Sequence, residues 1–291
     1  MSSCNLKSVI DKHIQDDNEK KTNNLENITL KLTKYLDCNI QQVNSSTLYN
    51  ELNKLLLMSV RNKELKTTKI LLSRYDIDIN CVDINGLTPI LLTIINHDIN
   101  ILNLLLNHPN IDINKCDKDG WSPLMVAIAT HDDMNDNIPI IKMLLDKNII
   151  INNSNKNGYT PMIICAMNGE FEIMKLLVNN GSNVNEKDSE NISVFVHAVM
   201  FTGKHTKFNN DMLDYLIENN ADIHFSNINN QSALFMCAHN GYFNMVKYCI
   251  EKNMDINQRD INGITPMEQA YKQGYKEIAN YLAKMLISTK Q

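Results

Sequence analysis

The 291-residue sequence predicts an all-α solenoid, in which repeated pairs of short helices stack side by side. One observation is a block of the type Asp-x-x-Gly-x-Thr-Pro, whose Pro position falls at 89, 123, 161, 194, 233 and 266. A second is that two short apolar segments with helical spacing lie between successive blocks. A period of 33 to 39 residues is typical of stacked repeats, because one such repeat cannot bury its apolar face alone.

Each element of the repeat has a local physical reason. The Thr or Ser before the Pro, such as Thr88 or Ser122, is expected to cap the first helix, and Pro suits the first helical position. The Gly of the block permits a tight hairpin turn. A closing segment such as Ile111–Asn114 ends five of the repeats, and its alternation predicts a short extended strand. Two weaker copies of the block, at 188–195 and 227–234, lack the Pro, so we expect these repeats to be less regular.

The boundaries of the repeats follow from these marks. We expect an array over residues 47–291 and number its repeats 1 to 7, at 47–82, 83–116, 117–154, 155–187, 188–226, 227–259 and 260–291. Repeat 1 is degenerate, and repeat 7 is a helical C-terminal cap whose last helix spans 277–287. Repeats 3 and 5 carry about five and about six extra residues, around 131–135 and 202–208, which we expect to lie between their two helices.

Residues 1–46 precede the array and hold two segments with a helical period, at 5–16 and 23–37. We interpret them as a helical N-terminal cap that covers the end of the stack. A small adaptor domain is the alternative interpretation.

The repeats resemble the ankyrin repeat, which has about 33 residues, a turn, two helices and a Thr-Pro-Leu-His signature. The resemblance covers about residues 48–291. It implies that hairpin turns join the helix pairs, and that the hairpin tips and first helices form a concave groove for partner proteins. The His of the signature is absent, so we expect apolar packing to replace its buried hydrogen bond. The residues at this position are Leu91, Met125, Ile163, Val196, Phe235 and Glu268.

The resemblance, carried over position by position, predicts a partner-binding surface on this groove. The residues assigned to it are Ile84, Asn85, Leu87, Lys118, Asp119, Trp121, Lys156, Tyr159, Ile192, Met167, Met200 and Phe201. Trp121 and Tyr159 occupy the same position in adjacent repeats, and binding hot spots favour Trp and Tyr. The alternative is that the two rings merely pack along the hairpins. Ile261, at a hairpin tip in repeat 7, extends the same surface.

The composition argues against several other classes of protein. The net charge is −5 and only 3 of the 28 basic residues are Arg, which disfavours nucleic-acid binding. No run of 18 apolar residues predicts a membrane span, and the N-terminus shows no secretory leader. The seven cysteines stand singly, which predicts reduced thiols in a cytoplasmic compartment. We expect a monomer, with self-association as the alternative.

No motif in the sequence predicts catalysis, a cofactor or a metal site. The Asp-x-Asp-Gly run at Asp117 suggests a calcium loop, but the ligands that such a loop needs at its first and last positions are absent. The pair His131 and Asp132 lacks the further ligands of a metal site. Cys165 and Cys237 fall on first helices, where we expect small buried side chains rather than nucleophiles.

These observations predict a non-catalytic protein–protein interaction module. The chain has 44 Asn and 35 Ile, and Lys exceeds Arg by 25 to 3, which indicates an AT-rich genome. In large DNA viruses and intracellular pathogens, proteins of this kind resemble host-directed adaptors or effectors, which act in the host cytoplasm. Two alternatives stay open. Residues 1–46 could recruit a ubiquitin ligase, or the hairpin residues Asn114, Asn185 and Asn257 could be substrates of Asn hydroxylation, as such positions are in ankyrin repeats.

Overall fold

The computed structural model of the chain describes residues 45–74, 77–131, 134, 136–205 and 210–288. These residues form two compact halves, Met1–Ile149 and Ile150–Gln291. The expected helices at 5–16 and 23–37 lie outside the described residues, as does nearly all of the expected cap over 1–46.

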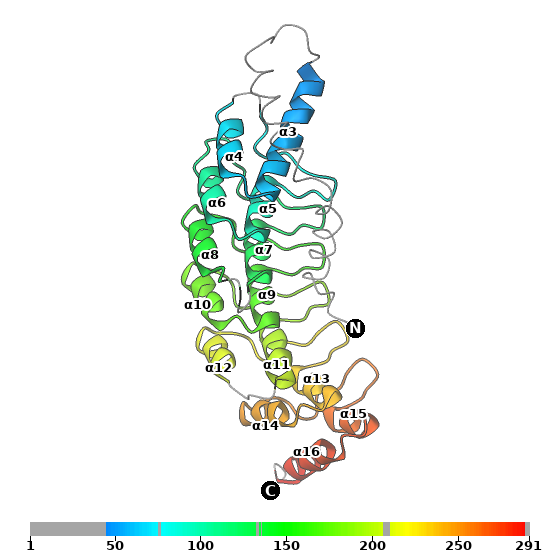
Figure 1. Ribbon diagram of the computed structural model, residues 1–291. Helices are drawn as coiled ribbons and strands as arrows, with labels where there is room; N and C mark the ends of the chain where they lie inside the picture. The colour runs from blue at the N-terminus through cyan, green and yellow to red at the C-terminus, as the bar shows by residue number, and fades with distance from the viewer. Residues whose placement is uncertain (1–44, 75–76, 132–133, 135, 206–209, 289–291) are drawn as a thin grey trace. The chain divides into compact units, whose positions relative to one another are not determined.

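The described residues of the N-terminal half form three helix pairs. They are α3 (Ser45–Arg61) with α4 (Leu65–Leu72), α5 (Pro89–Ile95) with α6 (Ile99–Leu106), and α7 (Pro123–Ala129) with α8 (Ile138–Leu145). Each pair is one repeat, and α5 packs on both α3 and α7. The first helices therefore form one row and the second helices another, as Figure 1 shows for this half. In α5 and α7, six of the seven residues are buried, which makes the first helices the centre of the core.

In the C-terminal half, the part of the chain that the structure describes forms four helix pairs. They are α9 (Pro161–Asn168) with α10 (Phe171–Asn179), α11 (Val194–Lys204) with α12 (Asp211–Glu218), α13 (Ala233–Asn240) with α14 (Phe243–Glu251), and α15 (Pro266–Lys272) with α16 (Lys276–Ser288). The first helices again pack in series, α9 on α11, α11 on α13 and α13 on α15. The last helix agrees with the expected span of 277–287 to within one residue at each end. The described residues thus have the all-α solenoid architecture that the sequence predicts.

The first helices begin as the sequence predicts. In repeats 2 to 7 the residue before the first helix accepts a hydrogen bond from the backbone N–H three residues later. These residues are Thr88, Ser122, Thr160, Ser193, Ser232 and Thr265. Val194 and Ala233 replace Pro after Ser193 and Ser232, and the cap is unchanged. The hydroxyl rather than the proline therefore fixes where each helix starts.

The two repeats expected to be irregular keep the same hairpin. In both, an Asn takes the place of the Gly and adopts a left-handed backbone, with φ of 60° at Asn191 and 56° at Asn230. Asn tolerates this region better than other non-glycine residues. Each side-chain amide also donates to the carbonyl of the residue just before the next hairpin, Asn191 to Ser226 at 2.8 Å and Asn230 to Arg259 at 2.7 Å. The hairpins of these two repeats therefore keep the turn, because Asn replaces Gly and adds a bond.

The expectation of extended strands is also wrong for the closing segments. In segments such as Ile111–Asn114 the first polar side chain accepts a hydrogen bond from the backbone N–H two residues later, as Asp112 does from Asn114 at 3.0 Å. This bond closes a turn. Within the described residues, β pairing consists of two isolated bridges, Lys187 with Ser193 and Ser226 with Ser232.

The two insertions differ from each other. Residues 202–204, which were expected in a loop, continue α11, so that this first helix has 11 residues. In repeat 3 the insertion is anchored by the fully buried Asn137. Its amide donates to the Ala127 carbonyl at 2.8 Å, and its oxygen lies 2.6 Å from Nδ1 of His97 in the preceding repeat.

In most repeats an apolar side chain fills the position of the missing signature His, as expected. In repeats 2 to 6 the residues at this position are 0% to 3% exposed. In repeat 7 the position belongs to Glu268, which is exposed and forms a capping box with Thr265. Apolar packing therefore replaces the His inside the stack, and a cap replaces it in the last repeat.

Candidate protein-binding surface

The hairpin of each repeat is held by one side chain. In repeats 2 to 7 its first residue is Asp or Asn, and Oδ1 of this residue accepts hydrogen bonds from the backbone N–H groups two and four residues later, at 2.8–3.0 Å. These residues are Asp83, Asp117, Asn155, Asp188, Asn227 and Asp260. The first residue also exchanges backbone bonds within each hairpin. The turns are therefore fixed before any partner arrives, and this pre-organisation lowers the entropic cost of binding.

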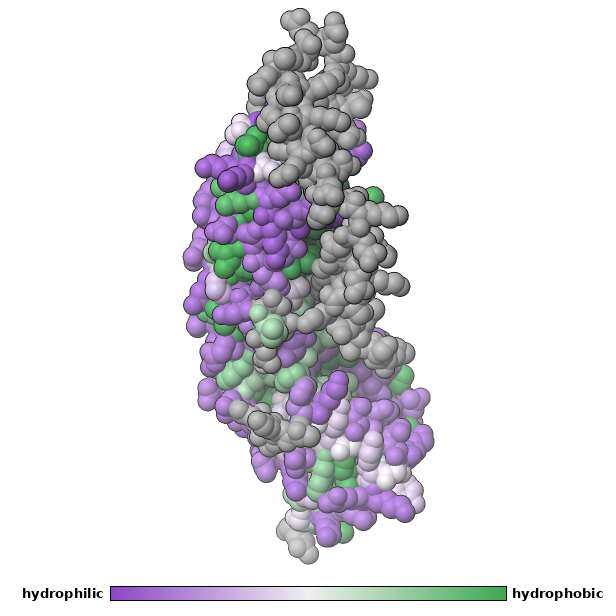
Figure 2. Space-filling view, in the orientation of Figure 1, coloured by the Kyte–Doolittle hydropathy of each residue, from purple (hydrophilic) through white to green (hydrophobic). Residues whose placement is uncertain are grey.

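The second position of each hairpin is the tip, and three of the tips carry exposed isoleucines. Ile84 is 85% exposed in the N-terminal half, and Ile228 and Ile261 are 63% and 65% exposed in the C-terminal half. Ile228 was missed among the predicted residues. Its place in the repeat, equivalent to Ile84 and Ile261, was the signal that could have found it. On the face seen in Figure 2, hydrophobic residues lie scattered among hydrophilic ones.

Backbone bonds tie successive tips together in the C-terminal half. The backbone N–H of Ile228 donates to the Glu190 carbonyl at 3.1 Å, and that of Ile261 donates to the Asn229 carbonyl at 3.0 Å. The exposed isoleucines of repeats 6 and 7 therefore stand on neighbouring hairpins at a fixed separation.

The other predicted tip residues differ in exposure. Lys118, Asp119 and Lys156 are exposed, while Asn85 and Leu87 are half-buried. Lys118 donates through Nζ to the carbonyl of Ile84 and so links two tips of the N-terminal half.

Trp121 and Tyr159 lie at the fifth hairpin position, one in each half, and both are half-buried. The Trp121 backbone is held on both sides, since its N–H donates to Asp117 and its carbonyl accepts from the backbone N–H of Asp117. The Tyr159 ring meets His197 edge-on, with ring centroids 6.2 Å apart. Burial raises the pKa of the Tyr159 phenol, and nearby Asp188 and Glu190 raise it further. The phenol is therefore a neutral donor with one face available to a partner.

His197, whose ring meets Tyr159, is held by a hydrogen bond with Asp188. His197 Nε2 lies 3.0 Å from Oδ2 of Asp188, and both side chains are largely buried. Burial alone raises the pKa of Asp188, but the bonds from His197 and from the backbone N–H groups of Ile192 and Glu190 lower it overall. This carboxylate is charged at neutral pH and fixes the ring on which Tyr159 rests.

Glu186 is a buried carboxyl that the sequence analysis did not single out. Burial raises its pKa to about 7, against a smaller opposing effect of its bond with Thr160. Its Oε2 is buried and makes no hydrogen bond with the described residues. No local pattern signals this, because Thr160 lies 26 residues earlier in the chain.

The predicted first-helix residues lie near the C-terminal ends of their helices. Met167, Met200 and Phe201 are half-buried, as is the hairpin residue Ile192. The Phe201 ring packs on Gly169, where a Cβ atom would collide with it, and stacks with His205 at 4.1 Å between centroids. Phe201 therefore has a packing role between repeats 4 and 5, and its role in binding stays a prediction.

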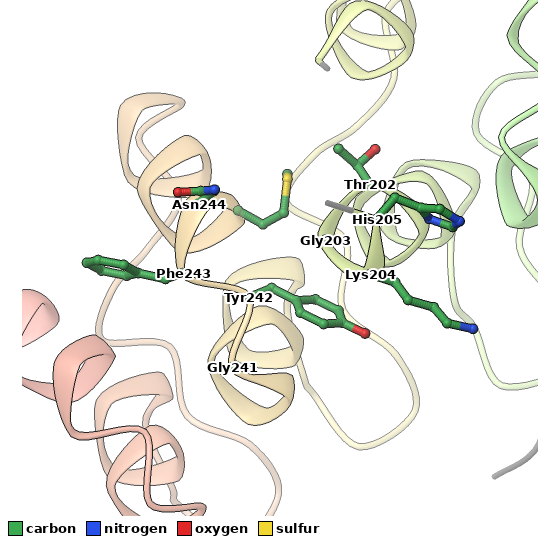
Figure 3. A pocket seen from close by; sticks show the side chains of 9 residues that line it. Thr202, Gly203, Lys204, His205, Gly241, Tyr242, Phe243 and Asn244 are labelled. Carbon is green, nitrogen blue, oxygen red and sulfur yellow. The ribbon is translucent and has the colours of Figure 1, made fainter. Parts of the chain in front are cut away.

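A second contact between an aromatic ring and a glycine borders a pocket of about 410 Å³ in the C-terminal half. The pocket lies between the end of α11 and the start of α14 (Figure 3). The Tyr242 ring lies against Gly203, which has no Cβ to obstruct it. Lys204 and His205 line the same pocket. We assign no ligand to this pocket.

Of the three modification candidates, Asn114 and Asn185 are half-exposed and Asn257 is exposed. The Asn185 side chain is engaged with the next repeat, donating to the Asn220 carbonyl at 3.0 Å and accepting from the backbone N–H of Asp222 at 2.7 Å. An enzyme would have to break both bonds to reach this amide.

The chemical groups considered for catalysis or metal binding have other roles. Asp117 holds its own hairpin through Oδ1, and no group of three His, Cys, Asp or Glu among the described residues could hold a metal ion. Cys165 and Cys237 are fully buried, and burial raises the pKa of both thiols. A protonated, inaccessible thiol is a poor nucleophile. None of the described helices is long and apolar enough to span a membrane.

Stacked helix pairs joined by pre-formed hairpins define a solenoid repeat protein. A family model described as ankyrin repeats (3 copies) matches residues 56–135, 133–188 and 196–290. The chain belongs to the ankyrin repeat family. No curated protein matches the chain.

Proposed function

We propose that this chain is a binding module that holds another protein on its hairpin tips and on the adjoining ends of its first helices. Ankyrin repeats are generally protein–protein interaction modules and are typically non-catalytic. The observation that carries the proposal is the set of exposed isoleucines on rigid hairpins, Ile84 in one half and Ile228 and Ile261 in the other. An apolar side chain held at a fixed place in solvent gains free energy when a partner covers it.

Two features support hot spots at the fifth hairpin position. Trp121 and Tyr159 are large side chains on fixed backbones, and each keeps part of its surface in solvent. Interface hot spots are enriched in Trp and Tyr at such places. We expect them to anchor the partner, while the isoleucine tips extend the contact.

A finer proposal is that the partner is a host protein and that the chain acts as an adaptor or effector in the host cytoplasm. The excess of Asn, Ile and Lys supports this, since it is typical of AT-rich genomes such as those of large DNA viruses. A source lysate and a host lysate would distinguish a host partner from a partner of the source organism.

Affinity capture with two double variants tests the binding surface. The variants are Trp121→Ala/Tyr159→Ala and Ile228→Ser/Ile261→Ser, and the matched control is Ile287→Ser, which changes an isoleucine on α16 that is 67% exposed. We expect a captured protein to bind the wild type and the control, and to lose about 2 kcal/mol or more of affinity with the Trp121 and Tyr159 variant. Equal capture by all four proteins, at unchanged melting temperatures, would place the binding surface elsewhere.

Two alternative proposals have their own measurements. Hydroxylation at Asn114, Asn185 or Asn257 predicts a mass increase of one oxygen atom on peptides from the native protein. Ligase recruitment by residues 1–46 predicts that a chain without these residues still binds its substrate but no longer captures ligase subunits.

A further inference from the structure

The last repeat presents the surface that an internal repeat uses for packing. In α13, Leu234, Phe235 and Ala238 are 0% to 2% exposed, and α13 packs on α15. The equivalent residues of α15 are Met267, Glu268 and Tyr271, and Tyr271 is 71% exposed. This side of repeat 7 therefore faces outward where, in repeat 6, the next repeat covers it (α15 and α16 in Figure 1).

The outward side is an apolar groove rather than a polar cap. A hollow of about 270 Å³ lies between α15 and α16, lined by Met267, Glu268, Tyr271, Ala279, Asn280 and Ala283. The two alanines leave room for side chains from another molecule. End repeats of solenoids usually carry a polar outer face. An exposed apolar groove with polar residues at its edge is instead typical of an interaction site.

The charges beside the groove complement one another under a two-fold rotation. Glu268 and Lys272 are four residues apart and so share one side of α15. Met267 and Tyr271 have the same spacing on the adjoining side. When two copies of α15 lie antiparallel about an axis level with Ala270, Glu268 of each copy faces Lys272 of the other, and the two Tyr271 residues lie close to the axis. A symmetric dimer requires such a self-complementary patch.

We propose that a second copy of this chain docks in the groove, with the two α15 helices antiparallel, to form a two-fold symmetric dimer. The dimer uses the end of the repeat stack and leaves the hairpin tips to the partner of the proposed function. It also replaces the sequence-based expectation of a monomer. Two chains joined in this way would present two binding surfaces to a partner, which can raise the apparent affinity for a multivalent partner.

Charge exchange between two variants of the full chain tests the proposal. Lys272→Glu and Glu268→Lys each place like charges opposite one another in the dimer, and each should weaken self-association at least about tenfold. An equimolar mixture of the two variants restores both attractive pairs, so we expect it to recover the dimer. The matched control is Lys276→Glu, which reverses an exposed lysine of α16 outside the groove.

Light scattering and sedimentation equilibrium over a concentration series give the readout. We expect the wild type and the control to shift from the 33.3 kDa mass of one chain to twice this mass as concentration rises. Circular dichroism verifies the fold of each variant, because Glu268 also caps α15. Tyr271→Lys, which leaves the cap intact, should abolish the dimer independently. A wild type of single-chain mass at every concentration, or a mixture no more dimeric than its components, overturns the proposal.

Discussion

Replacing Glu186 by Gln tests whether a buried acid limits the stability of the C-terminal half. The pKa of Glu186 rises from an ordinary value of 4.5 to about 7 in the fold, chiefly through burial. The folded protein therefore holds this proton more tightly than the unfolded chain does. Stability is then lost as the pH rises from about 4.5 to about 7, and the loss is complete above that range. Gln has nearly the same shape and cannot ionise.

The expected magnitude follows from the size of the shift. A rise of about 2.5 units corresponds to about 3.4 kcal/mol at full effect. The side chain keeps some contact with water, and screening reduces this to about 1–2 kcal/mol. We expect Glu186→Gln to match the wild type near pH 5 and to exceed its free energy of unfolding by about 1–2 kcal/mol at pH 8.

Urea unfolding followed by circular dichroism at pH 5 and pH 8 measures this difference. The other titratable groups are common to both proteins and cancel when the variant is compared with the wild type. Glu190→Gln, which removes an exposed carboxylate from the hairpin that follows Glu186, is the matched control. A difference for Glu186→Gln that is equal at the two pH values, or that favours the wild type at pH 8, would refute the reasoning.

Four further substitutions in the same half have expected outcomes, each measured by thermal or urea unfolding. Gly158→Ala should cost about 2 kcal/mol or more, because the new Cβ meets the Ser189 backbone and φ is 76°, whereas Gly181→Ala, with open space at φ 85°, should cost about 1 kcal/mol from backbone strain alone. Equal costs for the two would show that the collision is relieved. Asn185→Ala should cost about 1–2 kcal/mol through its two bonds to repeat 5, and an unchanged midpoint would mean that water replaces them. Ser193→Ala should cost about 1 kcal/mol through the lost helix cap, and no loss would show that Val194 alone fixes the helix start.

Features that depend on a few consecutive residues could be predicted from the sequence. The helix caps at residues such as Thr160 and the hairpin turns were predicted correctly, because each needs only one side chain and the backbone beside it. The apolar spacing over 277–287 predicted both ends of α16 to within one residue. The regularity of the hairpins without Gly was underestimated, because the sequence pattern treated a missing Gly as the loss of the turn. Asn191 supplies the same backbone and adds a bond to Ser226.

Features that depend on residues far apart in the sequence could not be predicted in this way. Glu186 and Thr160 are 26 residues apart, and only the folded chain brings the carboxyl beside the hydroxyl. Phe201 looked like a surface residue from its position in α11, but its ring fills the space that Gly169 leaves. Ile228 could have been found by comparing hairpin positions across repeats.

The hairpins separate the residues that hold the fold from those that meet a partner. The first position is always Asp or Asn, and its Oδ1 makes the same two bonds in six repeats. The second position varies among Ile, Lys and Ser, and the fifth among Leu, Trp, Tyr, Ile and Gln. The backbone bonds do not involve these variable side chains, so the tips can change chemistry without loss of the turn. This separation explains why the fold could be predicted from the repeat alone, whereas the partner must be sought at the positions where the repeats differ.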